Sequence, residues 1–560
     1  MVIIKTSFSE RQRLNLGFNW FVESIFDNHS IMKKKAIFIL VFGILFVQKL
    51  FAQEEQRCNS YEYQQYLKAT VPGYAEMIEQ SEIYLQDYIK THKNKSGRSI
   101  ITIPVVVHLL YHPDSTNQQL SDWQITSQID ALNEDYRRFN ADKFKTPSLF
   151  DSIAADCEIE FCLAKRDPNG NATNGIRRIV TSESLIVNWL SAKQTAAGGD
   201  DPWPYTEYLN IWVCALQYPL LGFATFPSNS INPAEDGVVI HYKAFGRINC
   251  FSKKYYEGRT ATHEVGHWLN LAHIWGDDAN CIKDDIVDDT PIQAEEHYKC
   301  DGFPYPSCSN TSDMFMNYMD YTLDSCMNVF TFGQKTRMVN SVNAFRSSLL
   351  SSNGCDPLPS SYAWDIGVTK ILYPDEFIYG ETMQPVVTVK NFGIQSITSA
   401  DIVYTKNWRS SENIYSWSGD LGPNESIDIT LPEIADSSWY NLFCAWTKNP
   451  NGNFDEDTTN DFKTRSYIVS LQYPPITDFV KVYPNPNGGI VTIDFGEIID
   501  LEGKVSIYNV LGQMEQVKME QLSLSKFQID LSNFPSALYF IELNVNGEKV
   551  VKKVIVQHEL

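Results

Sequence analysis

The chain has 560 residues, more than one compact domain usually holds, and at about 100 to 200 residues per domain it should contain three or four units. Its composition, 43% hydrophobic and 13% aromatic, is that of a globular protein and excludes long disorder. The 46 basic and 68 acidic side chains give a formal net charge of −22, which opposes binding to nucleic acid or to anionic membrane surfaces.

The beginning of the chain predicts export. Residues 32–52, MKKKAIFILVFGILFVQKLFA, start with three lysines, continue with about a dozen mostly apolar residues and end in a small residue, as signal peptides do. This run is too short to span a bilayer comfortably, so we expect no transmembrane segment in the mature chain. Residues 1–31 fit no part of a signal peptide and are expected to be a non-native extension. Export leads to an oxidising compartment, where the eleven cysteines can pair with at least one left over.

Residues 53–98 predict a removable pro-segment. Their pattern is polar and helical, without the apolar density of an independent core. The segment ends in a cluster of Lys, Gly and Ser, followed by the pair Arg98 and Ser99. Such an exposed basic site is one that proteases cut, so we expect cleavage between these two residues.

A mixed helix-and-sheet domain is expected over residues 99–355. From Ile100, IITIPVVVHLLY predicts a buried strand, and SDWQITSQIDALNEDYRRF predicts a helix. Further strands are predicted at CEIEFCLA, LNIWVCAL and GVVIHY. The fold class of this block is therefore α+β.

Two small all-β modules are expected to follow. After the turn-rich DPLPSSYAW the helical patterns stop, and residues 361–468 predict short strands of an immunoglobulin-like sandwich, in which no site is evident. Residues 479–560 again predict strands only, from VKVYPNPNGGIVTIDF to the closing LYFIELNVNGEKVVKKVIV.

The stretch ATHEVGHWLNLAH, residues 261–273, carries the clearest chemistry. On a helix, His263 and His267 are four residues apart and project from one face toward one ion, with Glu264 beside them. This is the H-E-x-x-H arrangement, in which two neutral imidazoles bind Zn²⁺ and the carboxylate takes a proton from the metal-bound water.

His273 can join this pair only if the helix ends first, because a continuing helix would carry it to the far side of the axis. Asn270 lies between, and asparagine is the commonest non-glycine residue to accept the left-handed conformation that would turn the chain back. Three imidazoles would leave one tetrahedral position open, as in catalytic zinc sites. The alternative is three unrelated histidines on an ordinary buried helix.

This pattern resembles that of the metzincin metalloproteases, H-E-x-x-H-x-x-G-x-x-H followed by a Met-containing turn, with Asn270 in place of the usual glycine. Downstream, MNYMDY supplies Met319 as the candidate Met-turn residue, although taken alone Met319 would be read as a core methionine. Tyr321 matches the tyrosine that in several metzincin families ligates the resting metal or stabilises the oxyanion. The motifs HEVGHWLNLAHIWGD, DDIVDDTP, NYMDY and FTFGQKTRM resemble the pappalysin family, in particular its ulilysin-like, cytophagalysin branch.

The resemblance implies a zinc endopeptidase in which His263, His267 and His273 hold the metal. Zinc-activated water would attack the peptide bond, Glu264 would act as general base, and Tyr321 would help to hold the oxyanion. The strand GVVIHY is a candidate edge for an extended substrate to pair with, and its His241 is expected to be a strand residue rather than a ligand. Such enzymes tend to favour a basic residue just after the cut bond.

The resemblance also implies calcium and disulfides in the segment after the zinc helix. By position, the calcium ligands would be Asp285, Asp289 and Thr290, and clustered carboxylates suit this hard cation, although a solvated acidic loop is the alternative. The implied disulfides are Cys281–Cys308 and Cys300–Cys326, while four cysteines permit three connectivities. Spacing does not assign the partners of the remaining cysteines, which are Cys157, Cys162, Cys214, Cys250, Cys355 and Cys444.

Cys58, in RCNSYEY, would by this resemblance occupy the open zinc position as a thiolate and keep the enzyme latent until cleavage after Arg98. Asn59 and Ser60 depart from the Gly-Thr that is common at this place in the family. The alternative is a Cys58 that is disulfide-bonded or merely reduced.

Residues 479–558 resemble the C-terminal sorting domain of the type IX secretion system, through VYPNPNGGIVTIDF, VSIYNVLGQ and the closing strands. The middle module resembles adhesive or spacer modules called CARDB-like. We therefore expect a protein that is secreted by, or attached to the outer surface of, a Gram-negative bacterium, with the secretion machinery and protein or peptide substrates as partners.

The sequence thus favours an exported zinc endopeptidase made as a zymogen. One alternative is a surface adhesin that works through its β modules and keeps the protease fold as a scaffold, which the intact His263, Glu264, His267 and His273 argue against. A metal-dependent hydrolase of non-peptide bonds is a weaker alternative, because the text around Met319 is peptidase-like.

Overall fold

The computed structural model describes residues 57–92, 100–470, 480–494 and 505–558, with short gaps at 187–189, 218, 229–231, 249–251, 253, 278–280, 376, 380–381, 409–410, 436–439, 511, 516, 522–525 and 546–547. The expected N-terminal extension, the signal peptide and the cleavage site at Arg98 and Ser99 lie outside the described residues. Within the described part, no helix is long and apolar enough to cross a membrane.

A six-stranded sheet forms the centre of the first domain, with the order β2-β1-β4-β6-β5 and with β3 paired to the second half of β1. Every neighbouring pair is parallel except β5 with β6. The strands are β1 (Ile101–Tyr111), β2 (Ile159–Leu163), β3 (Ile176–Val180), β4 (Leu209–Cys214), β5 (Gly222–Ala224) and β6 (Val238–His241). The central strands are apolar without alternation because both faces of the sheet are covered.

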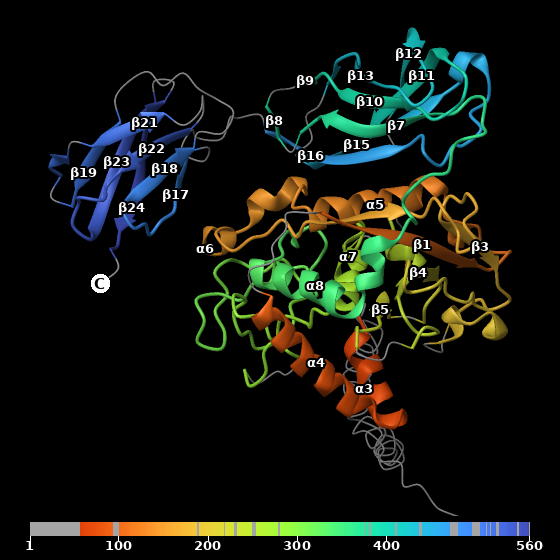
Figure 1. Ribbon diagram of the computed structural model, residues 1–560, viewed down its shortest axis with the longest axis horizontal. Coiled ribbons are helices and arrows are strands. Elements are labelled where there is room, and N and C mark those ends of the chain that lie inside the picture. Colours follow the sequence, from red (N-terminus) through yellow and green to blue (C-terminus); the bar gives the residue numbers. More distant parts are fainter. Residues whose placement is uncertain are drawn as a thin grey trace, which may run out of the picture.

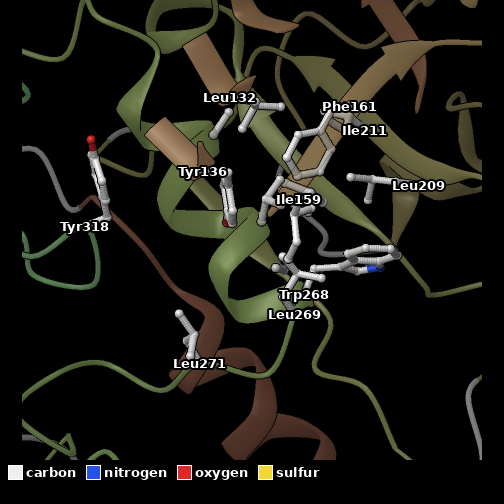
Figure 2. Packing of buried hydrophobic residues seen from close by; sticks show 14 of the residues in the cluster. Leu132, Tyr136, Ile159, Phe161, Leu209, Ile211, Trp268, Leu269, Leu271 and Tyr318 are labelled. Carbon is white, nitrogen blue, oxygen red and sulfur yellow. The ribbon is translucent and has the colours of Figure 1, made fainter. Parts of the chain in front are cut away.

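Helices cover one face of this sheet (Figure 1). Ser121 Oγ accepts a hydrogen bond from Gln124 N and starts α5, whereas a capping box of Thr331 and Gln334 starts α8. Figure 2 shows side chains of α5, such as Leu132 and Tyr136, near those of β2, such as Ile159 and Phe161, in a cluster that also contains Trp268 of α7. The helices are α5 (Asp122–Tyr136), α6 (Ser148–Asp151), α7 (Arg259–Trp268) and α8 (Phe332–Phe345), with 3₁₀ turns η1 (Thr116–Gln118), η2 (Ala141–Lys145), η3 (Ser191–Lys193), η4 (Thr195–Ala197), η5 (Tyr242–Ala244) and η6 (Ser347–Ser351).

The described part of the expected pro-segment forms two helices, α3 (Ser60–Thr70) and α4 (Tyr74–Thr91). Tyr63 and Leu67 of α3 are buried against Phe223 of β5 and its neighbours, and Glu82 of α4 forms an ion pair with Arg337 of α8. The two helices thus lie on the outside of the first domain (Figure 1), and the buried side chains of α3 belong to a hydrophobic cluster of that domain.

The prediction that GVVIHY forms an edge strand for substrate pairing is wrong. GVVIHY forms β6, which lies inside the sheet between β4 and β5, so it offers no free edge. The edge strand is β5, within LLGFATF, which has only three residues and gives little periodic signal. His241 ends β6, where its Nδ1 accepts from Lys243 N, as befits a strand residue.

Two β modules follow, as predicted, and the fold class is confirmed. The middle sandwich has sheets ordered β13-β10-β7 and β12-β11-β15-β16-β8 around one core, and the last module has sheets ordered β17-β18-β22-β21 and β20-β19-β23-β24. The middle strands are β7 (Ile366–Tyr373), β8 (Phe377–Tyr379), β9 (Thr382–Met383), β10 (Val386–Asn391), β11 (Ile397–Lys406), β12 (Asn413–Leu421), β13 (Ser426–Thr430), β14 (Ile434–Ala435), β15 (Tyr440–Lys448) and β16 (Lys463–Ser470), with the 3₁₀ turn η7 (Pro450–Gly452). The last are β17 (Lys481–Tyr483), β18 (Ile490–Asp494), β19 (Ser506–Asn509), β20 (Met514–Glu515), β21 (Lys518–Gln521), β22 (Lys526–Asp530), β23 (Ala537–Val545) and β24 (Glu548–Val556).

The middle sandwich packs against α5 of the first domain (Figure 1). Asp130 Oδ2 accepts hydrogen bonds from Thr464 N and Thr464 Oγ1, both at 2.9 Å, and Ser466 Oγ donates to Glu134. Beside them, aromatic side chains from both domains stack in one cluster, formed by Trp123, Trp408, Trp446 and Phe462. The sandwich is therefore joined to the first domain by hydrogen bonds and aromatic packing as well as by the connecting chain.

Candidate metal centre

Three histidines converge because α7 stops where the sequence predicts. Asn270 has φ 81°, in the left-handed region, and Leu271 N bonds back to Gly266 O at 2.9 Å, which closes the end of the helix. The chain then returns, so that His273 faces His267, with 3.1 Å between their Nε2 atoms. His263 Nε2 lies at the same 3.1 Å from His267 Nε2.

The outer ring nitrogens fix which nitrogen carries the proton. His263 Nδ1 lies 2.7 Å from Tyr318 O and His267 Nδ1 lies 2.7 Å from Leu271 O. Because a carbonyl oxygen only accepts, both Nδ1 atoms donate, and the Nε2 lone pairs point into the shared space. His273 Nδ1 bonds Asp277 Oδ1 at 2.5 Å in the same manner.

This donor set fits a zinc ion. Lone pairs that face one another at 3.1 Å repel unless a cation lies between them. Two ligands placed about 2.0 to 2.1 Å from one zinc ion at tetrahedral angles would lie about 3.3 Å apart. Cys58 Sγ and the three histidine nitrogens all lie within 4.8 Å of one another, and all four side chains are buried.

The electrostatics keep two of the imidazoles neutral. Burial, followed by the neighbouring histidines, lowers the pKa of His263 and His267 well below the ordinary value. Burial also acts to lower the pKa of His273, but the carboxylates of Asp277, Glu264 and Glu62 together outweigh it and the net pKa is raised. Carboxylate partners of this kind orient metal-bound imidazoles and increase their basicity.

Met319 and Tyr321, which follow the acidic segment in the chain, lie against the three histidines. Met319 is fully buried, and a Cβ placed on Gly266 would lie 2.5 Å from Met319 Sδ, so α7 can rest on the sulfur only because residue 266 is glycine. Tyr321 lies with its ring centroid 5.6 Å from that of His263 and 4.9 Å from that of His273. Its hydroxyl donates to Cys58 O at 3.1 Å.

Glu264 lies beside the imidazoles and is fully buried. Its Oε2 accepts from Ser60 Oγ at 2.8 Å and from Cys58 Sγ at 3.3 Å, while Oε1 has no hydrogen-bond partner among the described residues. Burial raises the pKa of Glu264 to about 7, although both of these hydrogen bonds act to lower it. This raised pKa belongs to the covered state, in which Cys58 and Ser60 contact the carboxyl group.

Residues 58–60 pass directly over this centre. Asn59 N donates to Gly222 O of β5 at 3.0 Å, and Ser60 Oγ accepts from Ala224 N at 2.8 Å. Burial, then the charge of Glu264, raises the pKa of the Cys58 thiol well above its usual value. A cation among the imidazoles would act in the opposite direction and favour the thiolate.

Sequence reasoning missed Arg57 and Asp324. Arg57 is fully buried, with Nη1 donating to Thr322 O at 2.6 Å and Nη2 to Asp324 Oδ1 at 2.9 Å. Asp324 Oδ2 accepts from Glu257 N at 2.9 Å and Arg259 N at 3.3 Å at the start of α7. The signal available in the sequence was the arginine directly before Cys58.

The acidic segment brings two of its three predicted ligands together. Asp285 Oδ1 accepts from Thr290 Oγ1 at 2.8 Å, and Asp285 Oδ2 is buried without a hydrogen-bond partner among the described residues. Asp289 instead faces α8, where its two oxygens accept from Thr331 Oγ1 at 2.6 Å and Gly333 N at 2.8 Å.

The disulfides of this segment are Cys281–Cys308 and Cys300–Cys326, the pairing that the resemblance implies. A further disulfide, Cys162–Cys355, joins β2 to the end of the domain across 193 residues. Spacing in the sequence does not assign these two cysteines to each other. Among the described residues, the buried cysteines outside any disulfide are Cys58, Cys157, Cys214 and Cys444.

Comparisons with known proteins agree with this geometry. The model of the peptidase M43 family, described as pregnancy-associated plasma protein-A, matches residues 194–343, and that of a secretion system C-terminal sorting domain matches residues 481–557. An extracellular metalloprotease of Arthroderma benhamiae is 38% identical over 275 residues, which are 47% of this chain and 81% of the relative.

Solved structures are also similar in sequence. A mutant of Tannerella forsythia promirolysin is 46% identical, with a TM-score of 0.49, over 53% of this chain and 97% of that chain. Mature mirolysin from the same organism, in complex with a cleaved peptide, is 50% identical, with a TM-score of 0.44, over 45% of this chain and 96% of that chain.

Proposed function

Since the chain belongs to the peptidase M43 (pappalysin) family of metalloproteases, we propose that it is a zinc endopeptidase made as a latent precursor. It is an extracellular protein with a C-terminal sorting domain of the type IX secretion system. The observation that carries the proposal is the convergence of His263, His267 and His273, with their Nε2 lone pairs turned inward and with Glu264 beside them.

When bound by the three imidazoles, zinc would supply a Lewis acid that lowers the pKa of water and polarises a carbonyl group. Glu264, beside His263 on α7, would take the proton from the attacking water and pass it to the departing amine. The Tyr321 hydroxyl, now on Cys58 O, would donate to the oxyanion after the pro-segment leaves. The free edge of β5 would pair with the substrate backbone, as it now does with Asn59.

The function is tested by metal removal on the activated protein. We expect casein hydrolysis to stop after treatment with a zinc chelator and to return when zinc is added. The zinc content, measured by atomic absorption, should rise and fall with activity. Full activity of the metal-free protein would contradict the proposal.

Latency would rest on residues 57–60. Cys58 would be the fourth ligand, Ser60 holds Glu264 Oε2, and Asn59 covers the edge strand. Cleavage between Arg98 and Ser99 would release these contacts. The precursor is then inactive because its base, its metal position and its substrate edge are all occupied.

Replacing Cys58 with alanine should weaken this latency. We expect the Cys58→Ala precursor to process itself several-fold faster, because the fourth ligand is lost while Ser60 still holds Glu264. The time course of processing, followed by gel electrophoresis, measures the effect. Tyr66→Phe on the exposed side of α3 is the matched control. Unchanged latency in Cys58→Ala would remove Cys58 from the metal position.

The position of Arg57 supports a preference for basic substrate side chains next to the cut bond. Its guanidinium donates to Asp324 Oδ1 at 2.9 Å and lies over the ring of Tyr255 at 5.0 Å. Once the pro-segment has left, the Asp324 carboxylate would face solvent without the guanidinium of Arg57. An arginine or lysine of a substrate would restore the pair.

Asp324→Asn should therefore weaken the preference for substrates with a basic side chain. We expect the ratio of kcat/KM for matched arginine and leucine peptides to fall by about 10- to 100-fold, the worth of one charge-assisted hydrogen bond. Using a ratio cancels any effect on the start of α7, which Asp324 also caps. Asp114→Asn, whose side chain is 91% exposed, is the control. An unchanged ratio would place the specificity elsewhere.

A calcium ion in the segment after α7 also remains part of the proposal. Asp285 and Thr290 lie together, and the unpartnered Asp285 Oδ2 leaves one buried oxygen for a hard cation. Asp289 is the least suited of the three expected ligands, because both of its oxygens already accept hydrogen bonds at α8.

A further inference from the structure

A second group of carboxylates lies far from the metal centre, in the middle sandwich. The loop between η7 and β16, DEDTTND, contributes Asp455, Asp457 and Asp461, and Asp365 joins them from just before β7. Three of these residues are buried, with exposed fractions of 2% for Asp365, 4% for Asp455 and 3% for Asp461. Four carboxylates are thus gathered where apolar side chains would be expected.

The backbone holds this loop in place. Asp455 Oδ2 accepts from Ile366 N and Asp455 Oδ1 from Asp457 N, both at 3.1 Å. Asp461 O accepts from Val368 N at 3.2 Å, and Asp365 Oδ1 accepts from Asn460 Nδ2 at 2.8 Å. All these donors are neutral amides, which position the carboxylates without balancing their charge.

No basic side chain balances the charge either. Among the described residues, none of the four carboxylates forms an ion pair within 4.0 Å, and Lys165 of the first domain interacts with Asp457 and Asp365 only at longer range. Burial, then the neighbouring carboxylates, raises the pKa of Asp461 to about 10. Burial is also the main cause that raises the pKa of Asp365 to about 7 and of Asp455 to about 6.

Asp461 provides an independent sign that something is bound here. Its Oδ1 atom is buried and has no hydrogen-bond partner among the described residues. The Asp461 carboxyl group lies at hydrogen-bond range of the Asp455 carboxyl group, so the two adjoin within the acidic group. A buried oxygen without a partner is costly, and a coordinated cation would satisfy it together with the surrounding charge.

We propose that Asp365, Asp455, Asp457 and Asp461 form a binding site for a hard divalent cation, which in an extracellular protein is calcium. Carboxylate oxygens are the ligands that calcium prefers, and the site has no nitrogen or sulfur ligand for a softer metal. The zinc-type group is the one cluster in the described residues whose side-chain ligands all lie within 4.8 Å, so calcium would draw this loop inward. Main-chain carbonyls and water would complete the shell.

The position of the site suggests what the cation does. The loop leads directly into Phe462, whose ring stacks on Trp123 at 5.2 Å, and into Thr464, which bonds Asp130 of α5. The same loop therefore holds the calcium and the interface with the first domain. Bound calcium would fix the sandwich on the protease.

The test is a count of bound calcium in the full precursor, made inactive by Glu264→Gln so that it does not digest itself. We expect Asp461→Asn, which keeps the shape and removes the charge, to bind one calcium ion fewer per chain in equilibrium dialysis. Asp420→Asn, on an exposed position of β12 in the same sandwich, is the matched control and should bind as many as the parent. Asp285→Asn should lose its own ion independently.

Terbium luminescence gives a second readout that does not depend on a variant of the acidic group. Trp364 is next to Asp365, so terbium bound here should be sensitised by tryptophan and displaced by calcium, and Trp364→Phe should reduce the emission. Equal calcium counts in Asp461→Asn and Asp420→Asn, or terbium emission indifferent to Trp364, would overturn the site. Either result would leave the carboxyl groups sharing protons instead.

Discussion

Replacing Glu264 with glutamine is expected to lower kcat by about 10²- to 10⁴-fold, the usual contribution of a positioned general base. Glutamine keeps the shape of the side chain but cannot take a proton. Glu264 is not one of the four side chains that converge on the metal position, so the zinc content should stay unchanged. The measurement is the rate of peptide cleavage by the activated enzyme, together with zinc analysis of the same sample.

The control for this prediction is Glu183→Gln, the same change at an exposed glutamate. It should leave both the rate and the zinc content at the parent level. Activity of Glu264→Gln within a few-fold of the parent would remove Glu264 from the role of base. Loss of zinc in that variant would instead show that the carboxylate supports the metal.

The metal centre could be predicted from the sequence because its determinants are local. His263 and His267 are fixed by one helical turn, and Asn270 is a single residue whose backbone preference decides whether His273 returns. Met319 could be placed only through the resemblance, because its contact with Gly266 joins segments about fifty residues apart in the chain.

The features that the sequence did not reveal depend on contacts between distant segments. The three-residue strand β5 becomes the edge only through its pairing with β6. Arg57 meets Asp324 across 267 residues, and Cys162 meets Cys355 across 193. No periodicity connects such pairs. Asp461, too, is an ordinary turn residue in the sequence, and only its burial beside Asp365 and Asp455 makes it unusual.

Contacts between distant segments also bring the first domain and the middle sandwich together at helix α5. Helix α5 carries Asp135, whose carboxylate accepts hydrogen bonds from Thr262 Oγ1 at 2.7 Å and from Tyr318 OH at 2.8 Å. Thr262 directly precedes His263, the first of the three converging histidines. Glu134, the residue before Asp135, accepts from Ser466 of the sandwich. One helix thus contacts both the middle sandwich and residues that lie beside the three converging histidines.

Replacing His273 with alanine is expected to remove the metal from the mature enzyme and to reduce activity to background. The two remaining imidazoles, on α7, would have to hold zinc without the third ligand that the turn at Asn270 brings back. Asp277→Asn should have a smaller effect, a loss of about 10- to 100-fold in zinc affinity, because it disturbs only the orientation and basicity of His273. His112→Ala, at a histidine outside the converging group, should change neither quantity. The mature form is the one to measure, since in the precursor Cys58 could compensate for the missing ligand. A His273→Ala enzyme that keeps its zinc and cleaves casein at the parent rate would show that the third ligand comes from elsewhere in the chain.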